Sequence, residues 1–426
     1  MVTSWAVSQI DLSDPGFWGR PFGERDAAFE LLRRERPVAF FPEPAVPSLP
    51  PGPGFWALTR YEDVAMASRE PGLFSSAPGS VLPDLPAGPP FSYLRSMIDM
   101  DDPGHARMRR LAAAVFTLRA VRQLNGRVEA ACQEIIDEVI ERGECDMAAD
   151  VALPLASRLI CDLLGVPRAD QGWVMQRALV AYGRDDPEYV PGVVDDPGRG
   201  ALAVLDAAVQ LAGYAYELSR GKRARPGADL VSRLAAAELD GRPLTDEQLA
   251  QWFILLVIAG TETTRQAISH GVLMLDRHPD QNAAWWQDFA RVAPTAAEEI
   301  VRWSSPVIAF RRTLTRDAVL SGQQLAAGAK VMLFYPSANR DERAFPHAYR
   351  FDLARAPNPH LGYGGPGPHY CLGAHLARAE IQALFRALFT RMPDLQVTGD
   401  PHWLRSSSIN GIKHLPVRYT PSRPRA

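Results

Sequence analysis

Apolar residues recur with helical spacing through most of this chain. Between residues 104 and 180 they follow the three-to-four-residue period of amphipathic helices, and Gly165 stands where one such helix would end. The longest periodic segment begins after Thr245, which forms a capping box with Gln248, and stops at His278, before a proline. We therefore expect a helix of about 32 residues, roughly 48 Å long.

Short β-rich segments and loops surround these helices. Residues 37–60 mix strand-like aromatic residues with proline and glycine, which indicates a small irregular sheet or hairpin. Residues 72–103 are rich in glycine and proline and predict a long loop, and residues 183–200 form a second irregular stretch. Strand segments follow residue 310, and a further helix from about Leu372 precedes a C-terminal strand region. We expect one mainly α-helical domain of 426 residues with small peripheral β-sheets.

Composition narrows the class of protein. The chain is 46% hydrophobic and 22% charged, which is ordinary for a globular protein. Its formal net charge of −3 gives no electrostatic reason to expect nucleic acid or an anionic membrane as a partner. The longest apolar run, residues 252–260, falls far short of the ~20 residues of a membrane span, and the N-terminus does not resemble a signal peptide. We therefore expect a cytoplasmic monomer.

The centre of the long helix contains residues that weaken a helix. Ala259, Gly260, Glu262 and Thr263 lie within the sequence IAGTETT, residues 258–264. In a helix interior, glycine costs about 1 kcal/mol relative to alanine, and threonine also costs stability. The periodic pattern continues on both sides, which excludes a helix end. A packing face lined with hydroxyl groups and a chemical role are the interpretations that remain.

One cysteine differs from the other three. Cys371 directly precedes an amphipathic helix, where free N–H groups and the helix dipole favour a thiolate. Four glycines between residues 362 and 367 permit a tight turn close to whatever the sulfur binds. A buried thiol before a helix is the alternative, but a lone thiolate in such a loop, with His369 nearby, points to haem iron. The remaining cysteines lack metal-ligand spacing and are expected to be small core residues: Cys132, Cys145 and Cys161.

In their order, the motifs resemble those of the cytochrome P-450 superfamily, specifically the bacterial haem-thiolate monooxygenases. The similarity rests on the cysteine loop with LGAHLAR, on AGTETT, and on EIVRW, RFD, MDDPGHARMRRL and FRRTLTRD. It covers nearly the whole chain. It implies the cytochrome P-450 fold, with the long central helix over a haem b group.

The resemblance implies roles for the central helix. Ala259 and Gly260 would leave space for dioxygen beside a local break in the helix. Thr263 would hydrogen-bond the dioxygen as it is reduced, and Glu262 would relay protons to it from solvent.

The resemblance also implies how haem is held. The expected cofactor-binding residues are His105, Arg109, Arg312, His369 and Cys371, with Cys371 as the iron ligand and the first three at the propionates. Glu299 and Arg302 would form a buried ion pair that supports the cysteine loop. Arg350 would complete that network.

The cysteine loop departs from the family pattern. Gly364 stands seven residues before the cysteine, where the family usually has phenylalanine, and Tyr363 is one position further away. The loop is therefore one residue longer, with Pro366 as the extra residue, which leaves open the aromatic residue that packs under the haem. Such a loop, with DDPEY at 185–189 and INGIKHLPV at 409–417, is similar to actinobacterial enzymes that hydroxylate sterol side chains and methyl-branched lipids.

We expect an apolar substrate pocket. Its expected lining is Leu82, Leu85, Phe91, Ile254, Val257, Ile258, Val307, Ile308 and Ile409. Arg95 is the one clear anchor for a substrate carboxylate in these segments. The expected reaction is hydroxylation of an unactivated C–H bond in a sterol, terpenoid or branched lipid. It would use dioxygen and two electrons from a ferredoxin and its ferredoxin reductase.

Other functions stay open at this point. One is a tailoring oxidase that hydroxylates, epoxidises or couples a macrolide, polyketide or aromatic scaffold. Another is a peroxygenase, and a third is a non-enzymatic haem sensor or electron carrier; the pair of Glu262 and Thr263 argues against both. Residues 105–127 are markedly basic and are either a docking surface for an acidic ferredoxin or a solvated helix face.

Overall fold

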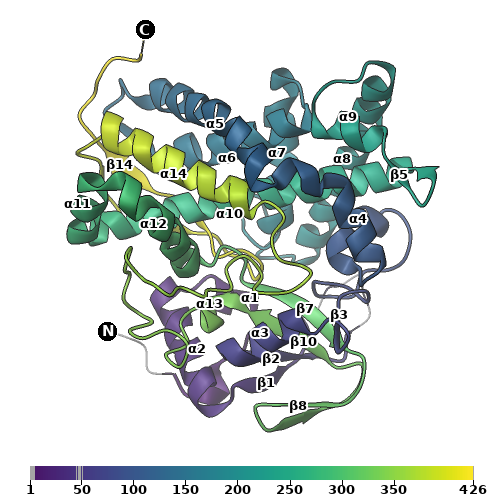
Figure 1. The fold of residues 1–426 in the computed structure, drawn as a ribbon. Coiled ribbons are helices and arrows are strands. Elements are labelled where there is room, and N and C mark those ends of the chain that lie inside the picture. The colour runs from purple at the N-terminus through teal and green to yellow at the C-terminus, as the bar shows by residue number, and fades with distance from the viewer. Residues whose placement is uncertain (1–4, 45, 47–48, 50, 426) are drawn as a thin grey trace.

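Helices make up most of the fold, and the largest sheet lies at one end (Figure 1). The computed structural model describes residues 5–44, 46, 49 and 51–425. The helices are α1 (Pro15–Trp18), α2 (Phe22–Glu35), α3 (Tyr61–Arg69), α4 (Gly104–Ala113), α5 (Leu118–Val139), α6 (Leu153–Leu164), α7 (Arg168–Tyr182), α8 (Gly198–Ala224), α9 (Leu230–Ala235), α10 (Asp246–Arg277), α11 (Pro279–Gln287), α12 (Phe289–Ser304), α13 (Tyr335–Ala338) and α14 (Ala374–Arg391).

Five strands form the main sheet, in the order β1-β2-β10-β7-β3. Strand β10 runs parallel to β2, and the other neighbours are antiparallel. Its strands are β1 (Val38–Phe41), β2 (Phe55–Leu58), β3 (Phe74–Ser75), β7 (Ala309–Leu314) and β10 (Lys330–Phe334). The smaller sheets are built from β4 (Glu144–Asp146), β5 (Glu238–Leu239), β6 (Arg242–Pro243), β8 (Ala318–Leu320), β9 (Gln323–Leu325), β11 (Gln396–Val397), β12 (His402–Trp403), β13 (Ile412–His414) and β14 (Pro416–Arg418).

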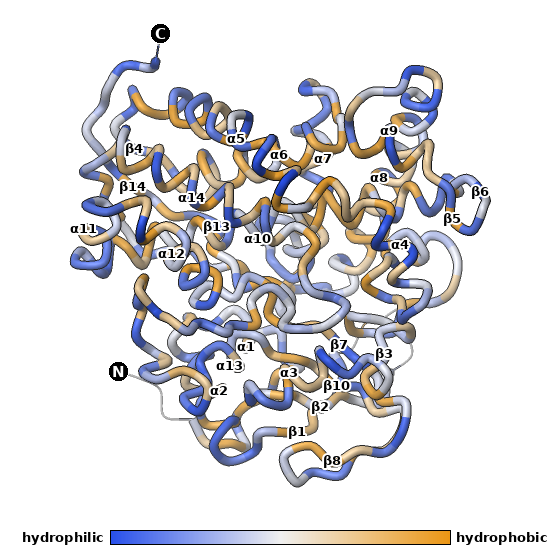
Figure 2. The backbone as a smooth tube through the Cα atoms, viewed as in Figure 1, coloured by the Kyte–Doolittle hydropathy of each residue, from blue (hydrophilic) through white to orange (hydrophobic). Residues whose placement is uncertain are grey.

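The long helix α10 crosses the helical part. It has 32 residues and begins with the predicted capping box of Thr245 and Gln248, so its length and start are confirmed. From residue 264 to 275 every side chain is buried, and α10 packs against α6, α7, α8 and α12. Apolar and polar residues alternate along the neighbouring helices, as Figure 2 shows for α5 and α14, because each buries one face.

The expected break near Gly260 is absent from α10, which is continuous from its first to its last residue. The hydroxyl groups of Thr261 and Thr263 instead donate to the carbonyls of Val257 and Ala259, each at 2.7 Å. A Cβ atom at position 260 would approach Ile160 Cγ1 of α6 to 2.7 Å. Glycine at this position therefore allows α6 and α10 to pack closely, which the prediction of space for dioxygen did not consider.

The predicted loops contain short elements. The 72–103 stretch includes β3 and two 3₁₀ turns, Phe91–Leu94 and Met97–Asp99. Strand β4 and the π-helical turn Met147–Ala152 interrupt the region that we expect to be helical. Cys132 and Cys161 are buried as expected, whereas Cys145 is only partly buried. Among the described residues, helices long and apolar enough to cross a bilayer are absent.

Candidate functional site

The loop before α14 holds Cys371 against its own backbone. The Cys371 N–H donates to the Tyr363 carbonyl at 2.9 Å, and the backbone N–H of Gly373 lies beside the sulfur. Burial raises the pKa of the Cys371 thiol, while this N–H and two nearby guanidinium groups oppose the rise. A Cβ atom at Gly367, where φ is +146°, would meet the Ser68 carbonyl of α3 at 1.9 Å. Only glycine lets the loop lie this close to α3.

Tyr363 belongs to this loop and is the aromatic residue whose backbone carbonyl accepts from the Cys371 N–H. Its ring is buried, lies 4.4 Å from the guanidinium carbon of Arg378, and is 6.1 Å from the ring of Tyr370. Arg378 also pairs with Glu298, which binds His360 at 2.9 Å. Sequence reasoning named Tyr363 only as a displaced aromatic, and it missed the partners that hold its ring.

Four of the predicted cofactor-binding residues converge beside the loop. The rings of His105 and His369 lie 4.2 Å apart, and Arg109 donates to the Tyr370 carbonyl at 2.6 Å. Burial, with the charges of Arg312, His105 and Arg109, lowers the pKa of His369 to about 3. Burial likewise lowers the pKa values of His105 and of Arg312. The guanidinium groups of Arg109 and Arg312 have no ion-pair partner among the described residues, so this side of the loop suits an anionic ligand.

The polar residues of α10 lie in different environments. Ala259 is exposed although Val257 and Thr261 are buried. Glu262 is 2% exposed, and its carboxylate accepts from Arg265 at 2.7 Å and from Gln266 at 2.8 Å. Both partners were missed, although the i, i+3 and i, i+4 spacings to Glu262 are those of neighbours on one helix face.

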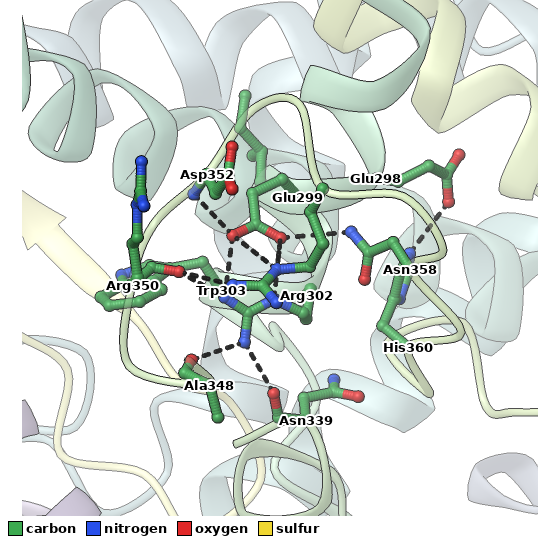
Figure 3. Close-up of polar contacts among 12 residues, drawn as sticks. Glu298, Glu299, Arg302, Trp303, Asn339, Ala348, Arg350, Asp352, Asn358 and His360 are labelled. Atoms are coloured by element: carbon green, nitrogen blue, oxygen red, sulfur yellow. Dashed lines mark hydrogen bonds and ion pairs between the residues drawn. The ribbon is translucent and has the colours of Figure 1, made fainter. Parts of the chain in front are cut away.

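A buried ion pair joins α12 to the loops that follow α13. Arg302 binds both oxygens of Glu299 at 2.8 Å, and neither side chain is exposed (Figure 3). The remaining Arg302 N–H groups donate to the carbonyls of Asn339, Ala348 and Arg350. The Arg302 N–H groups that point at the loops therefore all have hydrogen-bond partners, as a buried charge requires.

The second arginine of this network is Arg355, which corrects the prediction for Arg350. Arg350 is exposed, and in Figure 3 its side chain points away from Glu299 while only its backbone carbonyl takes part. The Arg355 guanidinium lies 3.2 Å from Glu299 and also binds three backbone carbonyls. Arg355 lies in a loop without periodic spacing, so the sequence offered no signal for this contact.

The residues expected to line a pocket are only partly brought together. Val307 and Ile409 form an isolated β-bridge, and Ile308 is buried beside them. On α10, Ile254 and Val257 are buried in the helical core and Ile258 is partly exposed. The three expected residues of the 72–103 loop are partly exposed: Leu82, Leu85 and Phe91. Arg95 donates to the Leu85 carbonyl at 3.0 Å, so it holds the loop instead of standing free as an anchor.

Comparison with known proteins identifies the family of this chain. The family model described as cytochrome P-450 matches residues 215–392. A methyl-branched lipid omega-hydroxylase of Mycobacterium tuberculosis is 43% identical over 418 residues, covering 97% of this chain and 95% of that protein. The chain belongs to the cytochrome P-450 family. This confirms the predicted recognition, and the enzyme is a cytochrome P-450 monooxygenase that hydroxylates hydrophobic substrates.

Two further cytochrome P-450 relatives support this family assignment. A steroid C26-monooxygenase of Mycobacterium tuberculosis is 40% identical over 372 residues, covering 86% of this chain and 83% of that protein. The structure of a cytochrome P-450 from Mycobacterium marinum in complex with pseudoionone has a TM-score of 0.91 and 39% identity, covering 96% of this chain and 98% of that chain. The predicted fold class, mainly helical with small sheets, is thereby confirmed.

The residues fit the haem group that the cytochrome P-450 family carries. Cys371 would supply a sulfur ligand, and the guanidinium groups of Arg109 and Arg312, with the imidazoles of His105 and His369 beside them, suit two propionates. The Nε2 atom of His105 is buried and has no hydrogen-bond partner among the described residues. Nδ1 of the same ring lies 3.3 Å from the Asp102 carboxylate, so a propionate oxygen beside Nε2 would accept a hydrogen bond from the protonated imidazole.

Proposed function

We propose that this cytochrome P-450 uses haem b to hydroxylate an unactivated carbon of a methyl-branched lipid or a steroid. The observation that carries the proposal is the likeness over 97% of the chain to a methyl-branched lipid omega-hydroxylase. Partly exposed apolar side chains at Ile258, at Val307 and in the 82–91 loop support it, because apolar burial at roughly 25 cal/mol per Å² would drive binding of such a substrate. Terpenoids share this chemistry and form the third substrate class.

The bound haem would supply dioxygen binding and activation, favoured by a thiolate ligand. Cys371 would be that ligand, and the Gly373 N–H would stabilise its charge. His105, Arg109 and Arg312 would hold the propionates, with His369 beside them. The chain itself thus fixes the cofactor from two sides and leaves α10 to handle protons.

Thr263 and Glu262 would handle those protons. The Thr263 hydroxyl donates to the Ala259 carbonyl at 2.7 Å, and rotation about one bond would turn it toward dioxygen beside Ala259. Glu262 would take up a proton from solvent and pass it on, which requires that its carboxylate leave Arg265. Thr263 would therefore need only a side-chain rotation to act, whereas Glu262 would first have to leave its ion pair with Arg265.

Electrons would reach the enzyme, a cytoplasmic monomer, from a ferredoxin and its ferredoxin reductase. The exposed arginines of residues 105–127 would form the docking surface: Arg107, Arg110, Arg119, Arg122 and Arg127. Arg107 pairs with Asp240 at 3.4 Å, which leaves the other four as the test set. Changing Arg110 and Arg122 to Glu should slow reduction by ferredoxin most at low salt, where charge steering is strongest.

Spectral titration of the ferric enzyme tests the substrate. We expect methyl-branched fatty acids and steroids to convert the low-spin to the high-spin spectrum, with hydroxylated products on addition of surrogate ferredoxin, its reductase and NADPH. Macrolide aglycones are the matched competitor class. Conversion by an aglycone alone, with none from the lipid and steroid panels, would replace this substrate class with that of a tailoring oxidase.

A further inference from the structure

Arg265, which binds Glu262, is itself bound by two residues that lie outside α10. Arg265, which is 2% exposed, donates one N–H to the Tyr189 hydroxyl at 3.2 Å and another to the Lys413 carbonyl at 2.7 Å. Tyr189 lies between α7 and α8, and Lys413 lies in β13. The position of this guanidinium therefore depends on two segments that are distant in sequence from residues 258–264.

Residues 186–189 are tied to the C-terminal strands by charge. The Lys413 ammonium lies 2.9 Å from both Asp186 and Glu188, and His414 lies 2.8 Å from Glu188. Asp186 also accepts from the Arg405 N–H at 2.9 Å. We call residues 186–189 with these partners the 186–189 clasp.

The clasp reaches from the buried pair of Glu262 and Arg265 to the surface of the protein. Tyr189 is partly exposed and Glu188 is exposed, whereas Glu262 and Arg265 are buried. The ring of Tyr189 lies against Gly183, where a Cβ atom would approach it to 2.3 Å. Movement of the 186–189 segment would remove the Tyr189 hydroxyl from Arg265 and open a route from water to the buried pair.

We propose that Tyr189 is a positioning residue for proton delivery in this monooxygenase. It holds Arg265 against Glu262, so Glu262 exchanges protons with solvent only when the 186–189 clasp opens. This inference rests on the proposed role of Glu262. It extends that role, because it makes a residue outside α10 set the rate at which the acid becomes available.

The experiment replaces Tyr189 by Phe, alone and together with Glu262→Gln, in the haem-loaded enzyme. In a single turnover started from reduced enzyme and dioxygen, Tyr189→Phe should speed the proton-dependent step by about fivefold, roughly what one hydrogen bond contributes to an equilibrium. The solvent isotope effect on that step should fall toward one without a change in KM. In the Glu262→Gln background, Tyr189→Phe should have no effect.

A second measurement follows the segment itself. Deuterium exchange of the peptide covering residues 183–190 should rise in Tyr189→Phe, and also in Glu188→Gln, which loosens the clasp without touching Arg265. Tyr182→Phe is the matched control: this hydroxyl lies near Glu262, and among the described residues it has no hydrogen-bond partner. It should leave both readouts at the wild-type level.

The outcomes separate this inference from the function on which it rests. If Glu262→Gln alone leaves turnover unchanged, the proposed role of Glu262 fails, and this inference fails with it. If Glu262→Gln slows turnover but Tyr189→Phe changes only KM or thermal stability, Tyr189 is structural and only this inference is overturned. A wild-type solvent isotope effect of one, or the same effect of Tyr189→Phe in both backgrounds, would also overturn it.

Discussion

The guanidinium of Arg265 lies 2.7 Å from the carboxylate of Glu262, three residues away on the same face of α10, and both side chains are 2% exposed. A buried pair of this kind costs much to break when one partner is removed, because the other charge is left uncompensated. Glu262 is therefore part of a buried ion pair in this structure. Its use as a proton donor requires a rearrangement that the alcohol of Thr263 does not need.

Replacement of Thr263 by Ala should divert reducing equivalents to hydrogen peroxide. Among the described residues, the Thr263 hydroxyl bonds only the Ala259 carbonyl of its own helix, so its loss should leave the fold and haem binding intact. The measurement is hydrogen peroxide formed and product formed per NADPH consumed. Thr261→Ala is the control, because its hydroxyl makes the same contact to Val257 but is buried in the helix packing. Equal coupling in wild type and Thr263→Ala would assign the hydroxyl to packing.

Replacement of Glu262 by Gln should slow turnover by ~10² to 10⁴-fold, the range typical of a lost general acid–base step. Glutamine keeps the shape, and its single carbonyl oxygen can still accept from Arg265, but Arg265 loses its counter-charge, so the rate is compared for folded, haem-loaded variant protein. The rate of product formation at saturating substrate is the measurement. Unaltered turnover with intact coupling would show that protons reach dioxygen by another route.

Replacement of Cys371 by Ser should remove the far-shifted Soret band of the reduced carbon monoxide complex. That band depends on a thiolate ligand, and Cys371 is the cysteine placed among the expected haem-binding residues. Cys145→Ser is the control, since Cys145 lies in β4, in another part of the fold. Persistence of the band in Cys371→Ser would contradict the assignment of the ligand.

Replacement of Arg302 by Ala should destabilise the enzyme, by less than the ~3 to 5 kcal/mol that a fully unpaired buried charge costs, because Glu299 would lose its bidentate partner but keep Arg355 as a counter-charge. Arg350→Ala should have little effect, since that side chain is exposed and only its carbonyl takes part. Chemical denaturation of the two variants separates the predictions. Equal loss of stability in both would restore Arg350 to the network.

The sequence predicted the features that follow from local spacing. The length and cap of α10 come from apolar periodicity and from Thr245 with Gln248, and the pair of Glu299 and Arg302 comes from one helical turn. Position along the chain also located Cys371 before its helix. These signals need no knowledge of the tertiary fold.

Contacts between distant segments could not be predicted in this way. Arg355 reaches Glu299 from a loop, Tyr189 reaches Arg265 from the connection between α7 and α8, and Ile160 fills the space beside Gly260. The last contact also explains why the predicted break in α10 was wrong. Small residues in a helix permit either a break or close packing, and only the partner helix decides between them.

A second buried acid, unlike Glu262, has no ion-pair partner among the described residues and should make stability depend on pH. Glu380 on α14 is 3% exposed, and burial raises its pKa to about 8, opposed only by the hydroxyl of Thr264. The unfolded chain loses this proton near pH 4.5, whereas the folded enzyme keeps it to about pH 8. The unfolded state therefore binds fewer protons in this window, and stability must fall as pH rises through it.

Glu380→Gln removes that dependence, because an amide stays neutral and can still accept from Thr264. At pH 4.5 the variant and the wild type should be about equally stable. As pH rises toward 8, the advantage of the variant should grow by roughly 1.4 kcal/mol per pH unit, to about 3 kcal/mol at pH 7. Urea midpoints of the haem-loaded proteins at several pH values between 5 and 8 measure this difference. Parallel curves for the two proteins would mean that Glu380 is ionised in the folded enzyme and has a cationic partner.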